Sequence, residues 1–168
     1  MNVTEEGSNL YQQWLPVWES YEREAKRISE GNRQGFIWSS SYNFSTEIVR
    51  SISEQTRHWQ EYRVGEVKHE GVRILPLHHC PEKTVLLAQV EPQATTRPHA
   101  HLGSSEIVYP IEGELHVRIR GADWTFTPQE FLHIPGGEEH PITAVTRALL
   151  LSVFRPGFDP KHVVFLGA

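Results

Sequence analysis

From Val64 onward the chain consists of short apolar runs separated by glycine, proline and charged residues. Short runs of this kind, bounded by turn residues, are typical of β-strands. The run from Leu115 to Arg120 alternates between apolar and polar side chains, so this strand should have one buried and one exposed face. Many short strands without an internal repeat predict an antiparallel sandwich or a closed barrel. The expected strands are residues 72–77, 84–90, 97–101, 106–111, 115–120, 124–127, 131–134, 141–145 and 148–154, with the tail 159–166 adding a last strand or covering an edge.

The first third of the chain has helical periodicity instead. Apolar residues recur at spacings of three and four from Leu10 to Ile28, and Gly31 stands where such a helix would end. Pro16 should start the regular part of this helix or kink it. A second helix is expected to begin after a cap at Ser45 or Thr46. We therefore divide the chain into a helical extension, residues 1–61, and a barrel domain, residues 62–168.

The aromatic residues of these helices are too numerous for a solvated segment. We expect them to pack the helices onto the outside of the barrel or onto a partner subunit, with Trp14, Trp18 and Trp59 as candidate interface anchors. The alternative is that one helix covers the barrel mouth or contributes to a pocket.

Four side chains in the second half of the chain indicate a metal site. His99 and His101 are two residues apart, so on a strand they project from the same face. Glu106 would follow from the next strand after a turn at Gly103, and a Pro-x-Gly turn would place His140. Three imidazoles and one carboxylate suit a divalent first-row metal and leave coordination positions open for water, oxygen or substrate.

These residues form two spaced motifs. His-x-His-x4-Glu-x6-Gly ends at Gly113, and Pro-x-Gly-x2-His runs from Pro135 to His140; together they resemble the two motifs of the cupin superfamily, over residues 62–156. The resemblance implies an all-β-dominated fold, the cupin double-stranded β-helix, a small antiparallel jelly-roll barrel preceded here by α-helices. It also implies one metal ion on His99, His101, Glu106 and His140, and a homodimer.

The chain departs from the family pattern at three positions that bind no metal. Gln93 and Gln129 stand where a glycine usually opens each motif, and Ala144 stands where an asparagine is common. The ligand set is therefore intact, while the local turns differ. The ligand types accept Fe, Mn, Ni, Zn, Co or Cu, and Fe(II) is favoured for an oxygen-using reaction.

The side chains expected around the metal follow from alternation along the strands. Val108 should share the face of Glu106, and Ile142 and Ala144 that of His140, which predicts a mainly apolar cavity for a small-molecule substrate. Further pocket candidates are polar residues near the ligands: Arg97, Tyr109 and His133.

The bulk properties exclude several classes of partner. The formal charge is −5, the sequence pI is about 6.0, and no basic run exists. Nucleic acid and anionic membranes are therefore not expected partners. The lone Cys80 allows no intrachain disulfide, and the N-terminus lacks the features of a signal peptide, so we expect a cytoplasmic protein.

Three functions remain open. The first is a non-haem Fe(II) oxygenase or dioxygenase acting on a small organic molecule. The second is a metal-dependent lyase, isomerase or decarboxylase; dimethylsulfoniopropionate lyases usually carry a tyrosine two residues after the glutamate, where this chain has Val108. The third is a metal- or ligand-binding sensor without catalysis.

Overall fold

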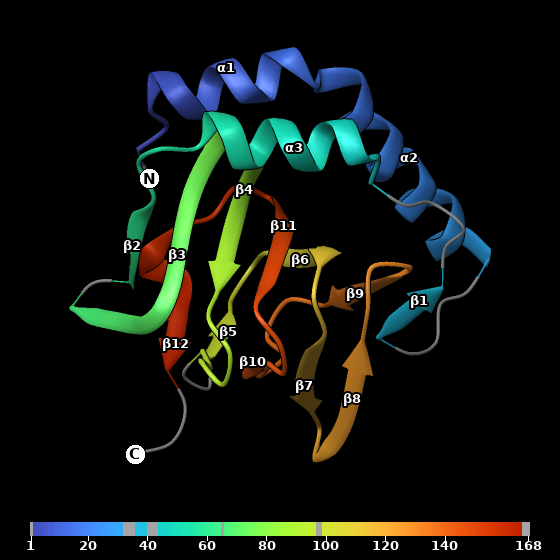
Figure 1. The fold of residues 1–168 in the computed structure, drawn as a ribbon. Coiled ribbons are helices and arrows are strands. Elements are labelled where there is room, and N and C mark those ends of the chain that lie inside the picture. The colour runs from blue at the N-terminus through green and yellow to red at the C-terminus, as the bar shows by residue number, and fades with distance from the viewer. Residues whose placement is uncertain (1, 32–35, 40–43, 65, 97–98, 166–168) are drawn as a thin grey trace.

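The fold is known from a computed structural model that describes residues 2–31, 36–39, 44–64, 66–96 and 99–165 (Figure 1). Its helices are α1 (Glu5–Gln13), α2 (Leu15–Gly31), α3 (Thr46–Gln55) and the short 3-10 helix Pro160–His162. Its strands are β1 (Ile37–Ser39), β2 (Gln60–Val64), β3 (Val67–Cys80), β4 (Lys83–Val90), β5 (His99–His101), β6 (Ser105–Glu112), β7 (Leu115–Ile119), β8 (Ala122–Phe126), β9 (Glu130–Ile134), β10 (Ile142–Ala144), β11 (Ala148–Arg155) and β12 (Val163–Phe165).

The strands form an antiparallel barrel. The largest sheet has the order β1-β9-β6-β11-β4-β3-β2, and the smaller sheets are β10-β7-β8 and β12-β5. Neighbours in the sheets are often distant in sequence; β11, for example, lies between β4 and β6. This double-stranded arrangement is the jelly roll expected from the two motifs.

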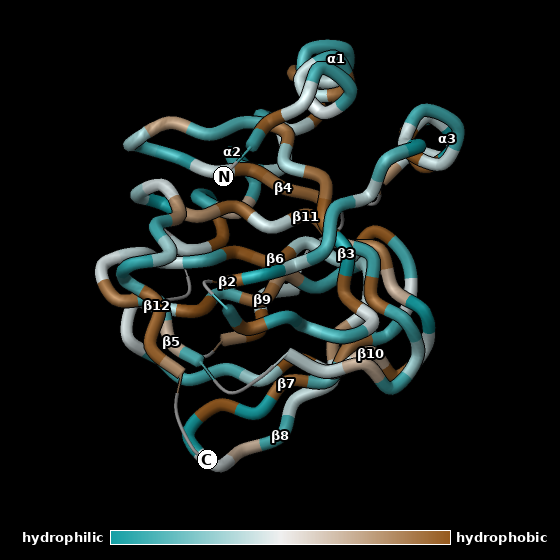
Figure 2. Tube along the Cα trace, turned by 90° about the vertical axis from the view of Figure 1, so that its left-hand side faces the viewer, coloured by the Kyte–Doolittle hydropathy of each residue, from teal (hydrophilic) through white to brown (hydrophobic). Residues whose placement is uncertain are grey.

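The large sheet is buried on both faces. Leu86, Ala88 and Val90 of β4 belong to a core inside the barrel, whereas Val85 and Leu87 of the same strand belong to a second core beneath the helices. Figure 2 shows the corresponding concentration of hydrophobic residues along the central strands. Period-two alternation therefore sorts the residues between two interiors instead of between core and solvent.

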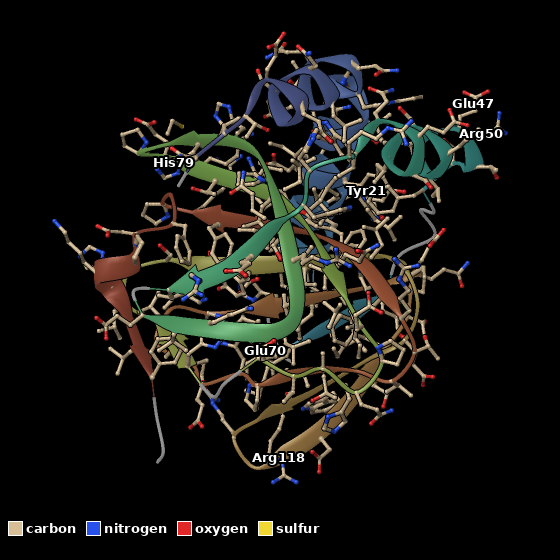
Figure 3. All side chains as sticks on the ribbon, turned by 60° about the vertical axis from the view of Figure 1, so that its left-hand side comes forward. Tyr21, Glu47, Arg50, Glu70, His79 and Arg118 are labelled. Carbon is tan, nitrogen blue, oxygen red and sulfur yellow. The ribbon has the colours of Figure 1, made fainter. Side chains whose placement is uncertain are left out.

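The N-terminal helices cover the outer face of the large sheet (Figure 1). Figure 3 shows Tyr21 pointing into the layer between helix and sheet, where it contacts Phe131 and Tyr109 edge-on. Trp18 is also buried there, and its indole N–H donates to the carbonyl oxygen of Tyr11. In the described structure the helices thus lie on the face of the large sheet that is turned away from the inner core. Trp18 cannot anchor a partner, because its side chain already lies within this chain's core.

The first helical segment is two helices, not one. α1 ends at Gln13 and α2 begins at Leu15, with Trp14 in a non-helical conformation between them. Pro16 lacks the amide hydrogen that would continue the helical hydrogen bonds, which explains the break. α3 begins as expected, with Ser45 accepting a hydrogen bond from the Ile48 amide at 3.3 Å. None of the helices in the described parts of the chain is long and apolar enough to span a membrane.

All nine expected strands are present with shifted ends, except that residues 97 and 98 lie outside the described residues. The tail adds β12, which pairs with β5. Two strands were not expected. β1 is only three residues long. The exposed charged side chains of β2 leave too few apolar residues for the sequence to indicate a strand there. β1 lies within the expected 1–61 extension and β2 crosses its end, and both strands are part of the large sheet. The boundary between the extension and the barrel stays a prediction.

Gly113 allows a test of the turn between β6 and β7. It has a positive φ of 89°, and an added Cβ would lie 2.4 Å from the carbonyl oxygen of Arg147. Gly121 also has a positive φ, of 76°, but nothing lies within 4 Å of its Cβ position. We expect Gly113→Ala to lower the free energy of unfolding by about 3–5 kcal/mol, from backbone strain and a backbone clash together. Gly121→Ala should lower it by about 1–2 kcal/mol, from strain alone. Urea denaturation of both variants measures the difference, and equal losses would contradict the role of the clash.

Candidate metal centre

Backbone hydrogen bonds bring the two halves of the site together. The amide of His140 donates to the carbonyl oxygen of His99 at 3.1 Å, and the amide of Gly137 donates to that of His101 at 2.9 Å. Gly137 has a positive φ of 85°, which favours glycine in the turn before His140. The loop 135–140 is therefore fastened along β5, and His140 is delivered beside the two histidines of that strand.

The four predicted ligands converge at this point. The ligand nitrogens of His99, His101 and His140 all lie within 4.8 Å of one another. The Oε1 atom of Glu106 lies 3.3 Å from His140 Nε2 and 3.7 Å from His101 Nε2. Two nitrogens that bind one Zn²⁺ at about 2.0–2.1 Å lie at most about 4.2 Å apart. The three nitrogens are therefore near the spacing at which they could share one ion.

A hydrogen bond to the backbone orients the His140 ring. Its Nδ1 lies 2.8 Å from the carbonyl oxygen of Glu138, which can only accept, so Nδ1 carries the hydrogen. Nε2 of the same ring faces Glu106 and lies 3.3 Å from its Oε1 atom. The Nε2 atoms of His140 and His101 are both buried, and neither has a hydrogen-bond partner in the described structure. Buried polar atoms without partners are rare, and two that face one carboxylate fit a cation site.

The ionisation states also suit a cation. Burial lowers the pKa of His101 to about 4, against the opposing influence of Glu106, so this imidazole is neutral near pH 7. Burial alone would raise the pKa of Glu106, but the neighbouring histidines, His140 foremost, outweigh it and lower that pKa to about 2. Neutral imidazole and ionised carboxylate are the forms that bind metal.

A cavity of about 50 Å³ lies beside these residues inside the barrel. Its apolar wall comes from several strands of the large sheet and from β10. The described lining residues are Tyr62, Val72, Ile74, Leu86, Ala88, Val90, Thr96, His99, Glu106, Val108, His140, Ile142, Leu150, Ser152 and Phe154.

The other pocket candidates are placed differently. Val108 and Ile142 line the cavity, as alternation predicts, and Ala144 is buried in the inner core without lining it. Tyr109 lies on the opposite face of β6, in the core beneath the helices, and His133 stacks on Trp38 at 4.6 Å. We correct the expectation for Tyr109 and His133, because neighbours of inward-pointing residues on a strand point outward. Arg97 lies outside the described residues.

Sequence reasoning missed three polar residues of the cavity: Tyr62, Thr96 and Ser152. Tyr62 lies on the unforeseen strand β2, where alternation with Glu61 and Arg63 could have signalled an inward side chain. His69, which is buried at 2% exposure, stacks on Tyr62 and lies edge-on to His99.

A match to a known sequence family agrees with the fold and the site geometry. The family described as "Cupin domain" matches residues 86–154, which contain the strands and loops that carry all four converging side chains. Residues 86–154 are a cupin domain, and the barrel that contains them has the fold of solved cupins.

Solved structures share the fold of this cupin at low identity. KdgF from Halomonas sp. has a TM-score of 0.55 and 19% identity, covering 71% of this chain and 99% of that protein. An RmlC-like cupin from Shewanella frigidimarina has a TM-score of 0.54 and 20% identity, covering 73% and 97%. Pac13 from Streptomyces, a nucleoside dehydratase, has a TM-score of 0.55 and 12% identity, covering 76% and 92%. A comparison with curated proteins gave no significant match.

The depressed pKa of His101 predicts a pH dependence for the metal-free cupin. The unfolded chain binds a proton at His101 below about pH 6.5, whereas the folded chain binds it only near pH 4. The free energy of unfolding should therefore fall as the pH drops from 6.5 to 4, by up to about 3 kcal/mol from this residue. The stabilisation from Glu106 is lost mainly below pH 4.5, as the pH falls toward 2.

Urea denaturation of metal-free protein across this pH range is the measurement. His101→Gln should lose less stability between pH 6.5 and 4 than the wild type does. His116→Gln, at a half-exposed histidine of β7, serves as the matched control and should follow the wild type. Identical slopes for His101→Gln and the wild type would contradict the assignment.

Proposed function

We propose that this cupin is a metal-dependent enzyme that acts on a small organic molecule inside the barrel. One divalent transition metal would be held by His99, His101, Glu106 and His140. The observation that carries this proposal is the pair of buried, unpartnered Nε2 atoms that face the Glu106 carboxylate. A hydrogen-bonded structural cluster would satisfy those atoms, whereas a cation site leaves them available.

The residues around the site support chemistry that excludes water. Most of the cavity wall is apolar, with Val108, Ile142 and Phe154 close to the ligands in the lining. Such a wall removes water from a bound molecule and strengthens the electrostatic interactions that it makes. A bound divalent ion would supply Lewis acidity or, as Fe(II), a partner for oxygen chemistry.

Within this class we propose a non-haem Fe(II) oxygenase or dioxygenase as the leading function. A site with four protein ligands leaves positions for a substrate atom and for O2. The dry, apolar wall would protect reactive species from water, and few polar side chains compete for the substrate. Iron is the metal that this reaction requires; Mn, Ni, Zn, Co and Cu suit the same ligands.

A specific observation favours a second candidate, a lyase, dehydratase or isomerase that moves protons without oxygen. Tyr62 places a phenol in the cavity wall, although Val108 occupies the position of the tyrosine found in dimethylsulfoniopropionate lyases. A nucleoside dehydratase is among the proteins of similar fold.

Metal content tests the shared part of both candidates. Alanine at His99, His101, Glu106 or His140 should lower the amount of bound transition metal, because loss of a direct ligand weakens metal affinity by more than the roughly 10- to 100-fold that loss of an outer hydrogen-bond partner costs. Elemental analysis of purified protein is the measurement, and circular dichroism checks the fold. His116→Ala, outside the cavity, is the control and should retain the metal. Unchanged metal content in all four alanine variants would refute the proposal.

Oxygen dependence separates the two candidates. We expect the Fe(II)-loaded protein to consume O2 with at least one compound from a panel of small diketones, flavonols and thiols, measured with an oxygen electrode. The Glu106→Ala protein is the matched control and should consume none. Turnover under anaerobic conditions with Mn, Ni or Zn would instead identify the lyase or isomerase, and ligand binding without turnover would identify a sensor.

A further inference from the structure

We propose that the Tyr62 hydroxyl donates a hydrogen bond to an oxygen atom of the molecule bound in the barrel cavity. This inference rests on the proposed metal-dependent function and adds a substrate-contacting residue to it. It also names the ligand class: small molecules whose bound end carries a carboxylate, carbonyl or hydroxyl oxygen.

Alternation along β2 places Tyr62. Glu61 pairs with Arg73 and Arg63 pairs with Lys68, so the extra residues of this irregular pairing are on β3. β2 itself keeps the period of two that points Tyr62 to the face opposite its neighbours. Here Glu61 and Arg63 are exposed, whereas Tyr62 lines the cavity.

The Tyr62 ring is held by the buried interior of the barrel. It stacks on His69 with ring centroids 4.6 Å apart and 20° between the planes. His69 in turn lies edge-on to His99 at 6.0 Å. Tyr62 is therefore fixed next to the strand that carries two of the proposed ligands, which a substrate-positioning group requires.

The hydroxyl of this fixed ring is available for a ligand. Among the described residues it makes no hydrogen bond. The other hydroxyls of the cavity wall are on shorter side chains, and that of Thr96 already accepts a hydrogen bond from the Ile142 amide at 2.9 Å. Burial and the charge of Glu106 raise the pKa of Tyr62, so the phenol stays protonated and can donate.

The cavity size limits the partner of this hydroxyl. A volume of about 50 Å³ corresponds to about three to five water molecules, at about 10–15 Å³ of such space for each. A small oxygen-bearing group fits that space. The apolar residues that surround it leave Tyr62 as the long-reaching donor for such a group.

Ligand affinity of the Co²⁺-loaded protein tests the inference without knowledge of the substrate. Acetate and ethanethiol are titrated separately, and the Co²⁺ absorption spectrum reports binding of each. Tyr62→Phe removes only the hydroxyl, and should weaken acetate binding about tenfold, the effect of one hydrogen bond. Ethanethiol binding should be unchanged, because sulfur is a weak acceptor. Tyr109→Phe makes the same change outside the cavity and should leave both affinities unchanged.

The outcomes separate the two proposals. Full Co²⁺ uptake with equal acetate affinity in wild type and Tyr62→Phe overturns the role of Tyr62 and leaves the metal site standing. Failure of the wild type to bind Co²⁺ overturns the proposed function and this inference with it. Should Tyr62→Phe fold poorly, Tyr62→Leu provides the second variant, and selective loss of acetate affinity in the folded protein again supports the proposal.

Discussion

The attachment of the 135–140 loop to strand β5 is the interaction on which the candidate site depends. Two backbone hydrogen bonds, from the amides of His140 and Gly137 to the carbonyl oxygens of His99 and His101, join segments about forty residues apart in the sequence. The bonds do not involve the imidazoles, so the rings remain available. The scaffold therefore positions the side chains without consuming the nitrogen atoms that chemistry needs.

The barrel gives this attachment its rigidity. β5 is only three residues long and pairs with β12 from the C-terminal tail, while β6 lies between β9 and β11 in the large sheet. Glu106 is thus on a central strand of the large sheet, and the histidines are on short segments that pack against its inner face. The carboxylate and the imidazoles thus come from different parts of the barrel and meet in its buried interior.

The sequence predicted most of this arrangement because the controlling signals are local. Spacing of two residues places His99 and His101 on one face, and the Pro-x-Gly turn brings in His140, so the four converging side chains could be named in advance. Tyr62 was not named, because the exposed charged side chains of Glu61 and Arg63 hide the short strand β2 in the sequence. Tyr109 shows the opposite limit. Proximity to Glu106 in sequence suggested a shared pocket, but the large sheet has an apolar core on each face.

That two-sided sheet has an evolutionary consequence. On β4, Leu86 and Ala88 border the cavity, whereas Val85 and Leu87 support the helices. Selection can therefore act on adjacent residues of one strand for separate reasons. Substitutions at alternate positions can change which molecules fit inside the barrel without altering the residues on which the helices pack.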